Sequence, residues 1–133
     1  MKAAVTELQR RAPRTGIAAI GFCFGGGMVW RLLAAGEKRL QAAAPFYGPF
    51  PEGGSMRHAR AAVLGVYRGL DGRVNATRDA ARIALEGADL DYRIQTFTEA
   101  NHAFFNDTGE RFDAAAAEEA WHQGLYWFGK HVD

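Results

Sequence analysis

The chain has 133 residues, which suits one domain, and we expect a single domain over residues 1–133. Hydrophobic residues make up 48% of the sequence and charged residues 23%, values that are typical of globular proteins and argue against disorder. The 16 basic and 15 acidic side chains leave a net charge of +1 without a basic stripe, so nucleic acid is not an expected partner.

The sequence also predicts a cellular setting. No apolar run approaches the ~18 residues that a membrane helix needs, and residues 1–14 lack the apolar core of a signal peptide. The one cysteine, Cys23, allows no internal disulfide, which favours a reducing, cytoplasmic setting. A lone cysteine in that setting is a candidate nucleophile.

Helical and strand-like segments alternate along the chain. The hydrophobic pattern predicts, in order, a helix over 3–11, a strand over 17–21, a helix over 24–35, strands over 41–46 and 61–67, a helix over 74–85, a strand over 92–97 and a helix over 111–131. This alternation predicts an α/β fold, a parallel sheet of about four strands with helices on both faces. Ligands of such sheets bind beyond the carboxyl ends of the strands.

Cys23 lies in a segment, Gly-Phe-Cys-Phe-Gly-Gly over residues 21–26, that joins a predicted strand to a predicted helix. A nucleophile elbow is a strained turn of this kind, with a nucleophile at its tip. The helix N-terminus favours a thiolate, and the N–H of Phe24 would be one donor of an oxyanion hole.

Three glycines belong to this predicted elbow: Gly21, Gly25 and Gly26. We expect the two that lie two positions either side of the cysteine to remove Cβ atoms that would clash in the turn. Two other interpretations remain open. A cysteine is often buried as a small hydrophobe, and a glycine-rich strand-to-helix turn can bind phosphate. The segment lacks the lysine of a P-loop and the glycine spacing of a dinucleotide site.

An acid and a base follow in the order expected after such an elbow. Asp71 comes just after the strand at 61–67, and His102 just after the strand at 92–97. The order nucleophile, acid, base is that of α/β-hydrolases. Of the other histidines, His58 precedes a strand, and His122 and His131 lie on the last helix, so we expect none of them at the site.

Three segments together resemble the dienelactone hydrolase (carboxymethylenebutenolidase) family of α/β-hydrolases: residues 21–26, residues 65–71 and residues 101–106. The resemblance runs from about residue 17 to the C-terminus. It implies that Cys23 is the nucleophile, Asp71 the acid and His102 the base of a triad. It also implies hydrolysis of small ester or lactone substrates through a thioester, without a metal or cofactor. Three aromatic residues, Phe22, Tyr47 and Phe104, are expected to line the substrate pocket.

The chain departs from the family pattern at several positions. Arg68 and Asn101 stand where the family usually has glycine. No cation follows His102 within residues 104–107, where dienelactone hydrolase proper has an arginine that holds the substrate carboxylate, so a dienelactone is not the favoured substrate.

The family fold would also be shortened here. Only the helix at 3–11 precedes the elbow strand, whereas the family has several strands and helices there. The elbow strand would then form an apolar edge of the sheet, which invites pairing with another chain. We therefore expect a homodimer, or association with a separate N-terminal half.

Three functions remain open on the sequence. The favoured one is a cysteine-dependent ester or lactone hydrolase. The second is a catalytically incomplete relative that acts as a binding or assembly module, because the missing part of the fold would supply an oxyanion donor. The third is a redox-sensing thiol at Cys23.

Overall fold

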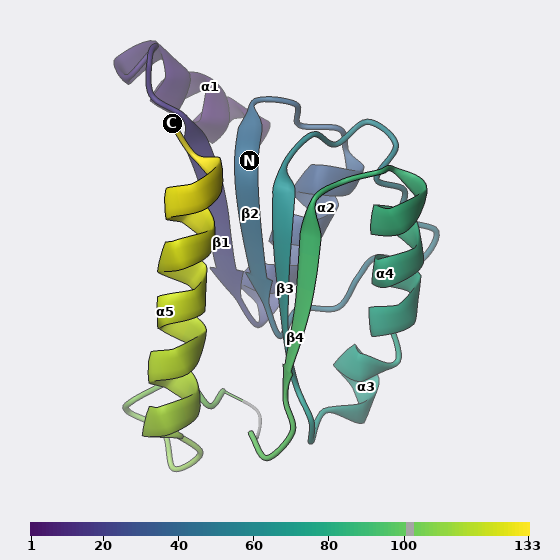
Figure 1. Ribbon diagram of the computed structural model, residues 1–133, viewed down its shortest axis with the longest axis vertical. Helices are drawn as coiled ribbons and strands as arrows, with labels where there is room; N and C mark the ends of the chain where they lie inside the picture. The colour runs from purple at the N-terminus through teal and green to yellow at the C-terminus, as the bar shows by residue number, and fades with distance from the viewer. Residues whose placement is uncertain (101–102) are drawn as a thin grey trace.

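The computed structural model describes residues 1–100 and 103–133 of the chain. Along the chain it contains α1 (Lys2–Arg11), β1 (Ile17–Phe22), α2 (Phe24–Ala34), β2 (Leu40–Phe46), β3 (Ala62–Arg68), α3 (Gly72–Asn75), α4 (Arg78–Gly87), β4 (Tyr92–Phe97) and α5 (Ala114–His131) (Figure 1). Within the described ranges, no helix is both long and apolar enough to cross a membrane.

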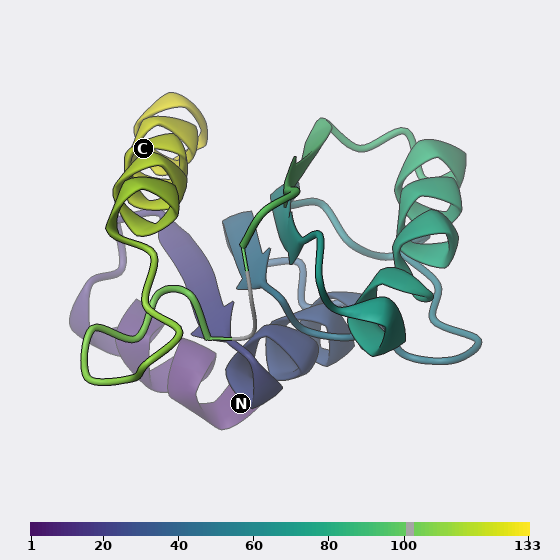
Figure 2. The same cartoon turned by 90° about the horizontal axis from the view of Figure 1, so that it is seen from below.

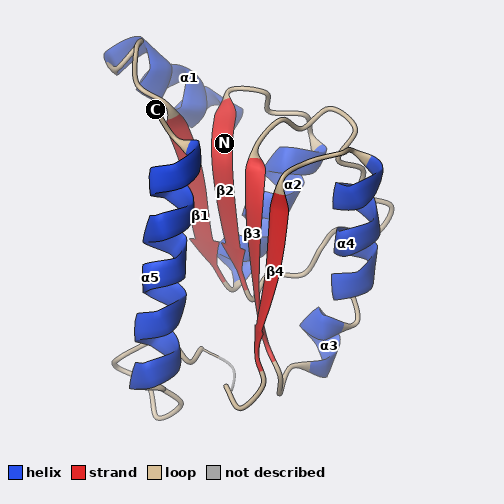
Figure 3. Ribbon diagram, viewed as in Figure 1, coloured by secondary structure: helices blue, strands red, loops and turns tan. Residues whose placement is uncertain are grey.

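The four strands form one parallel sheet in the order β1-β2-β3-β4 (Figure 3). The predicted α/β fold is therefore confirmed, and the elbow strand β1 lies at one edge of the sheet as expected. The strands run in the same direction, so their carboxyl ends meet at one end of the sheet, the lower end in Figure 1. The central strand β3 is buried along its whole length, which explains its continuous run of apolar residues.

Helices cover both faces of the sheet (Figure 2). On one face α1, α2 and α4 pack around a core that includes Trp30, Leu33 and Leu85. On the other face α5 packs its small residues, with Trp127, against the sheet. In the sequence of α5 these buried positions recur at helical spacing, because one stripe of the helix faces the sheet.

Two helices differ from their predicted bounds. The helix predicted over 74–85 is divided into α3 and α4, because Thr77 lies between them and hydrogen-bonds the carbonyl of Val74 at 2.7 Å. The last helix begins at Ala114 rather than at residue 111, because the Asp113 carboxylate accepts a hydrogen bond from the N–H of Ala116 at 3.0 Å and caps the helix there.

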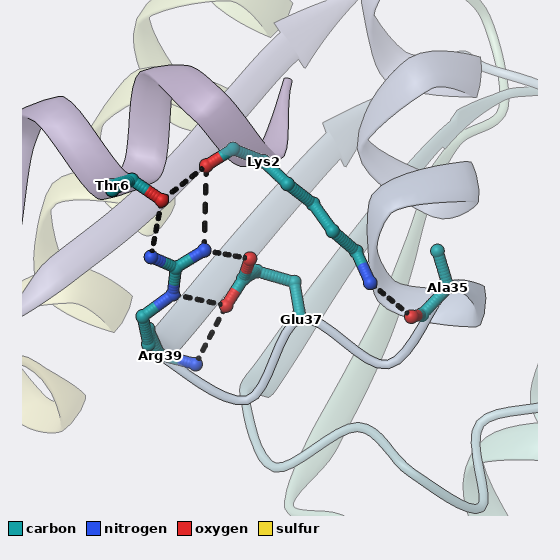
Figure 4. Close-up of polar contacts among 5 residues, drawn as sticks. All are labelled: Lys2, Thr6, Ala35, Glu37 and Arg39. Atoms are coloured by element: carbon teal, nitrogen blue, oxygen red, sulfur yellow. Dashed lines mark hydrogen bonds and ion pairs between the residues drawn. The ribbon is translucent and has the colours of Figure 1, made fainter.

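A polar cluster ties α1 to the segment that leads from α2 into β2 (Figure 4). The guanidinium of Arg39 donates to both oxygens of Glu37, at 2.7 and 2.6 Å, and to the hydroxyl of Thr6 at 2.7 Å. The ammonium of Lys2 donates to the carbonyl of Ala35 at 2.7 Å. The Arg39 hydrogen bonds hold the pKa of the buried Glu37 carboxyl down at about 2. This cluster fixes α1 at the end of the sheet opposite the strands' carboxyl ends.

Candidate active site

Cys23 occupies a strained turn between β1 and α2. Its φ is 53° and its ψ is −115°, a backbone conformation that a residue with a side chain rarely adopts. Two backbone hydrogen bonds hold it there: the N–H of Cys23 donates to the carbonyl of Phe46 at 3.0 Å, and its carbonyl accepts from the N–H of Gly27 at 3.1 Å. The turn lies at the carboxyl end of β1, where a nucleophile elbow was predicted.

The glycines around the turn differ in whether a side chain would fit at their position. A Cβ on Gly21 would lie 2.2 Å from the carbonyl oxygen of Gly25, and one on Gly26 would lie 2.4 Å from that of Phe46. No side chain fits at either position. A Cβ on Gly25 would meet nothing within 4 Å, so our expectation that Gly25 prevents a clash was wrong: its Cα faces open space.

A fourth glycine, Gly48, belongs to this turn and was not predicted from the sequence. A Cβ there would lie 2.1 Å from the backbone nitrogen of Gly27, so the loop after β2 packs directly on the first turn of α2. The preceding residue, Tyr47, has a φ of 37°, which lets the chain reverse at this contact. The only sequence signal was a Gly-Pro pair just after a predicted strand.

Phe24 begins α2 directly after the cysteine. The first N–H groups of an α-helix have no partner within the helix, and they point along its axis with the positive end of the helix dipole. The backbone of Phe24 is therefore in the place expected of an oxyanion donor. Its side chain is 78% exposed and forms no part of the core.

Asp71 lies just beyond the carboxyl end of β3, at the same end of the sheet as Cys23. Its carboxylate accepts a hydrogen bond from the N–H of Val74 at 3.2 Å and caps the short helix α3. The side-chain amide of Asn75 donates to the carbonyl of Arg68 at 2.7 Å and fixes the intervening turn. Hydrogen bonds within the loop thus hold the carboxylate that the sequence predicts as the acid.

The loop that carries Asp71 touches the segment that leads toward the predicted base. The N–H of Gly69 donates to the carbonyl of Phe97 at 2.7 Å, and a Cβ on Gly69 would lie 2.0 Å from the carbonyl oxygen of Thr98. His102 itself lies outside the described residues, so its assignment stays a prediction. The contact at Gly69 thus holds the loop of Asp71 against the backbone of Phe97 and Thr98.

Arg68, the last residue of β3, was noted in the sequence only as a departure from a family glycine. In the structure its side chain is fully buried and forms an ion pair with the carboxylate of Asp71. Its guanidinium carbon lies 5.1 Å from the centroid of the Tyr47 ring. A buried cation thus stands beside the predicted acid.

The three predicted pocket residues lie close together on the α5 face of the sheet. The ring centroids of Phe22 and Tyr47 are 6.2 Å apart, and those of Tyr47 and Phe104 are 5.5 Å apart. Tyr47 and Phe104 are buried, whereas Phe22 is partly exposed and stacks on Phe105 at 4.9 Å. The lining role of all three stays a prediction.

Two surface hollows are bordered by residues that follow the cluster or the elbow in the chain. One, of about 440 Å³, is lined by Phe105, Phe112 and Trp121 among others, and the sequence had indicated only a packing role for Trp121. The other, of about 220 Å³, lies between Phe24 on α2 and residues 49–52. The first borders Phe105, which stacks on Phe22, and the second borders Phe24, which follows Cys23. In the described ranges no group of three or more metal-ligating side chains gathers.

Some known proteins resemble this chain in sequence, and some solved structures have the same fold. A sequence model of the dienelactone hydrolase family matches residues 1–132. An Escherichia coli O157:H7 protein to which carboxymethylenebutenolidase activity is ascribed is 34% identical over 122 residues, which are 84% of this chain and 45% of that protein.

Two crystal structures have the same fold. One, ascribed to a dienelactone hydrolase of Klebsiella pneumoniae, has a TM-score of 0.78 and 27% identity, over 97% of this chain and 60% of that one. The other, a dienelactone hydrolase-like promiscuous phosphotriesterase from metagenomic libraries, has a TM-score of 0.77 and 26% identity, over 87% of this chain and 52% of that one. The chain thus spans about half the length of the curated relatives that it matches.

Proposed function

The chain belongs to the dienelactone hydrolase family, and on this premise we propose that it carries the nucleophile, acid and base of a hydrolase that cleaves carboxylic esters or lactones. Cys23 is the nucleophile, Asp71 the acid and His102 the base. The strained backbone of Cys23, at the N-terminus of α2, is the observation that carries this proposal. Strain of this kind persists where function requires it.

The proposed reaction has two steps. The Cys23 thiolate attacks the carbonyl carbon, and the resulting oxyanion is stabilised by the N–H of Phe24. When the C–O bond breaks, the leaving alkoxide takes a proton from His102, and a thioester remains. Water then gives a proton to His102, attacks the thioester and releases the acid with the thiolate restored. Asp71 orients His102 and stabilises its charged form. A cytoplasmic setting, which keeps the thiol reduced, suits this chemistry.

An ester-hydrolysis assay tests the proposal. We expect the purified chain to release nitrophenol from p-nitrophenyl acetate and to lose this activity on Cys23→Ala or His102→Ala, by about 10³-fold or more where turnover is complete. His58→Ala is a matched control, because His58 precedes β3 and lies at the opposite end of the sheet. Turnover that survives in Cys23→Ala would contradict the proposed nucleophile.

A second function is favoured by one observation, the coverage of about half of each curated relative. The remainder of the fold would supply a second oxyanion donor, and loss of one such donor lowers the rate by about 10²–10³-fold. The chain would then be a binding or assembly module, completed by a partner. A folded chain whose hydrolysis equals that of Cys23→Ala would favour this second function.

A further inference from the structure

The two edges of the sheet differ in their protection against pairing with another chain. The strand β4, at one edge, carries the charged side chain of Arg93 and the polar side chains of Gln95 and Thr96. The strand β1, at the other edge, has the sequence Ile-Ala-Ala-Ile-Gly-Phe and no charged side chain. Natural edge strands commonly carry charges that prevent pairing. The β1 edge lacks this protection, so it is the edge suited to pairing.

On the α5 face of the sheet, the side chains of β1 are left uncovered. Side chains alternate between the two faces of a strand, so Ala18 and Ile20 lie on the same face as Phe22, which packs in the core beneath α5. Both are exposed, Ile20 by 38%. Their partners in β2, Ala42 and Ala44, are 0% exposed. The cover that α5 gives to the sheet thus ends between β2 and β1.

The flank of α5 that faces β1 is apolar and exposed. The ring of Phe105 lies between the two elements, because its centroid is 4.9 Å from that of Phe22 in β1 and 6.1 Å from that of Trp121 in α5. Leu125 follows Trp121 by about one helical turn and lies on the same side of the helix. These two side chains are 41% and 50% exposed. We call the combined apolar surface of β1 and α5 the edge surface, and it comprises Ala18, Ile20, Phe105, Trp121 and Leu125.

The opposite flank of α5 is polar and has partners on the β4 side of the sheet. The Nζ of Lys130 and the Nε2 of His131 lie 3.8 and 3.6 Å from the carboxylate of Asp91. Asp91 directly precedes β4. The side-chain amide of Gln123 donates to the carboxylate of Glu119 at 2.6 Å. The two flanks of the helix thus differ in the same sense as the two edges of the sheet.

The two ends of the edge surface carry opposite charges. Residues 10–16, which lead into the amino end of β1, include three arginines and no acidic side chain. Residues 106–118 lie at the carboxyl end of the sheet and include four acidic side chains and one basic one. Of these, Asp107 and Glu118 are exposed and border the same hollow as Phe105 and Trp121. The edge surface therefore has a basic end and an acidic end.

A second copy of the chain fits this pattern of charge. Two identical strand edges pair about a two-fold axis, and the two β1 strands then run antiparallel. The amino end of each β1 meets the carboxyl end of the other, so the arginines of each copy face the acidic segment of its partner. This attraction occurs twice in the dimer. Both α5 helices remain on the same face, where each helps to cover the apolar side chains at the joint.

We propose that the edge surface binds a second copy of this chain, with the two β1 strands antiparallel and the two sheets joined into one. Main-chain hydrogen bonds between the strands hold the copies together, and the apolar side chains of the two edge surfaces bury one another. The inference goes beyond the proposed hydrolase, because no residue of the edge surface belongs to the proposed triad. An active chain and an inactive chain would dimerise alike.

Sedimentation equilibrium measures the dissociation constant of this dimer. We expect the unaltered chain to form a species of twice its mass of 14.5 kDa at micromolar concentration. Leu125→Glu should raise Kd about tenfold or more, since it buries a charge in the apolar joint. Tyr126→Glu is the matched control, because this residue is 71% exposed and points about 100° further around the helix. An equal change in both variants, or an unaltered chain that stays monomeric, would overturn the inference.

A charge exchange tests the identity and the direction of the partner. Arg14→Glu and Glu118→Arg each bring like charges together at both ends of the joint, so each variant alone should dimerise about tenfold more weakly. An equimolar mixture restores opposite charges at both ends. Native mass spectrometry should then show the mixed dimer in excess over either homodimer, with circular dichroism confirming that both variants are folded. A mixture that gives no more dimer than the separate variants would exclude antiparallel pairing with a second copy.

Discussion

At the scale of single residues, the elbow places two adjacent glycines in opposite surroundings. A Cβ on Gly26 would lie 2.4 Å from the backbone oxygen of Phe46, whereas one on Gly25 would meet nothing within 4 Å. We therefore expect Gly26→Ala to lower the free energy of unfolding by about 2 kcal/mol or more, because the backbone of β2 must shift. It should also displace the elbow and reduce esterase activity. Urea denaturation measures the first effect.

Gly25→Ala is the control one position away. In an open helical position alanine changes stability by at most about 1 kcal/mol, and in the favourable direction. If the two variants lost stability equally, the close packing of Gly26 on the backbone of Phe46 would be contradicted.

At the scale of elements, Glu37 joins α1, α2 and β2 through Arg39. Its pKa falls from 4.5 to about 2 in the folded chain. The folded state therefore favours the carboxylate, and the stabilisation is present above pH 4.5 and lost as the pH falls toward 2. We expect denaturation of the unaltered chain between pH 5 and pH 2 to show a steeper loss of stability than that of Glu37→Gln.

Glu7→Gln provides the comparison within the same polar end of the molecule. Arg10 and Arg11 also lower the pKa of Glu7, but that carboxylate is exposed on α1 and water screens the pairs. Its removal should leave the pH dependence nearly unchanged. Equal slopes for the unaltered chain and Glu37→Gln would contradict the assigned role of Glu37.

At the scale of the whole molecule, β1 leaves one edge of the sheet open. Ile20 on this strand is 38% exposed, and an apolar edge strand favours pairing with another chain. We predict that the chain self-associates at micromolar concentration and that Ile20→Lys weakens this association about tenfold or more. Sedimentation velocity over a concentration series measures it, and a folded monomer throughout would contradict the prediction of a homodimer.

Much of this fold could be predicted from the sequence, because local patterns of hydrophobic residues and glycines specify the helices, strands and turns. The four strands, the position of β1 at the sheet edge and the strand-to-helix turn at Cys23 follow from hydrophobic runs and glycines read in chain order. Parallel strands bring their carboxyl ends together, so Cys23, which follows β1, and Asp71, which follows β3, share one end of the sheet. These features depend on the residues of each segment and on the rule that the carboxyl ends of parallel strands meet at one end of the sheet.

Only the tertiary structure decided which distant side chains meet. Arg68 was a substituted glycine in the sequence, and it became a buried cation because β3 directs its side chain toward Tyr47 and the loop of Asp71. Gly48 gained its role from the close approach of α2, and Gly25 lost its expected one because its Cα faces outward. The sequence by itself determined the elements and their order. Packing decided the contacts, since burial and electrostatic attraction act between residues far apart in the chain.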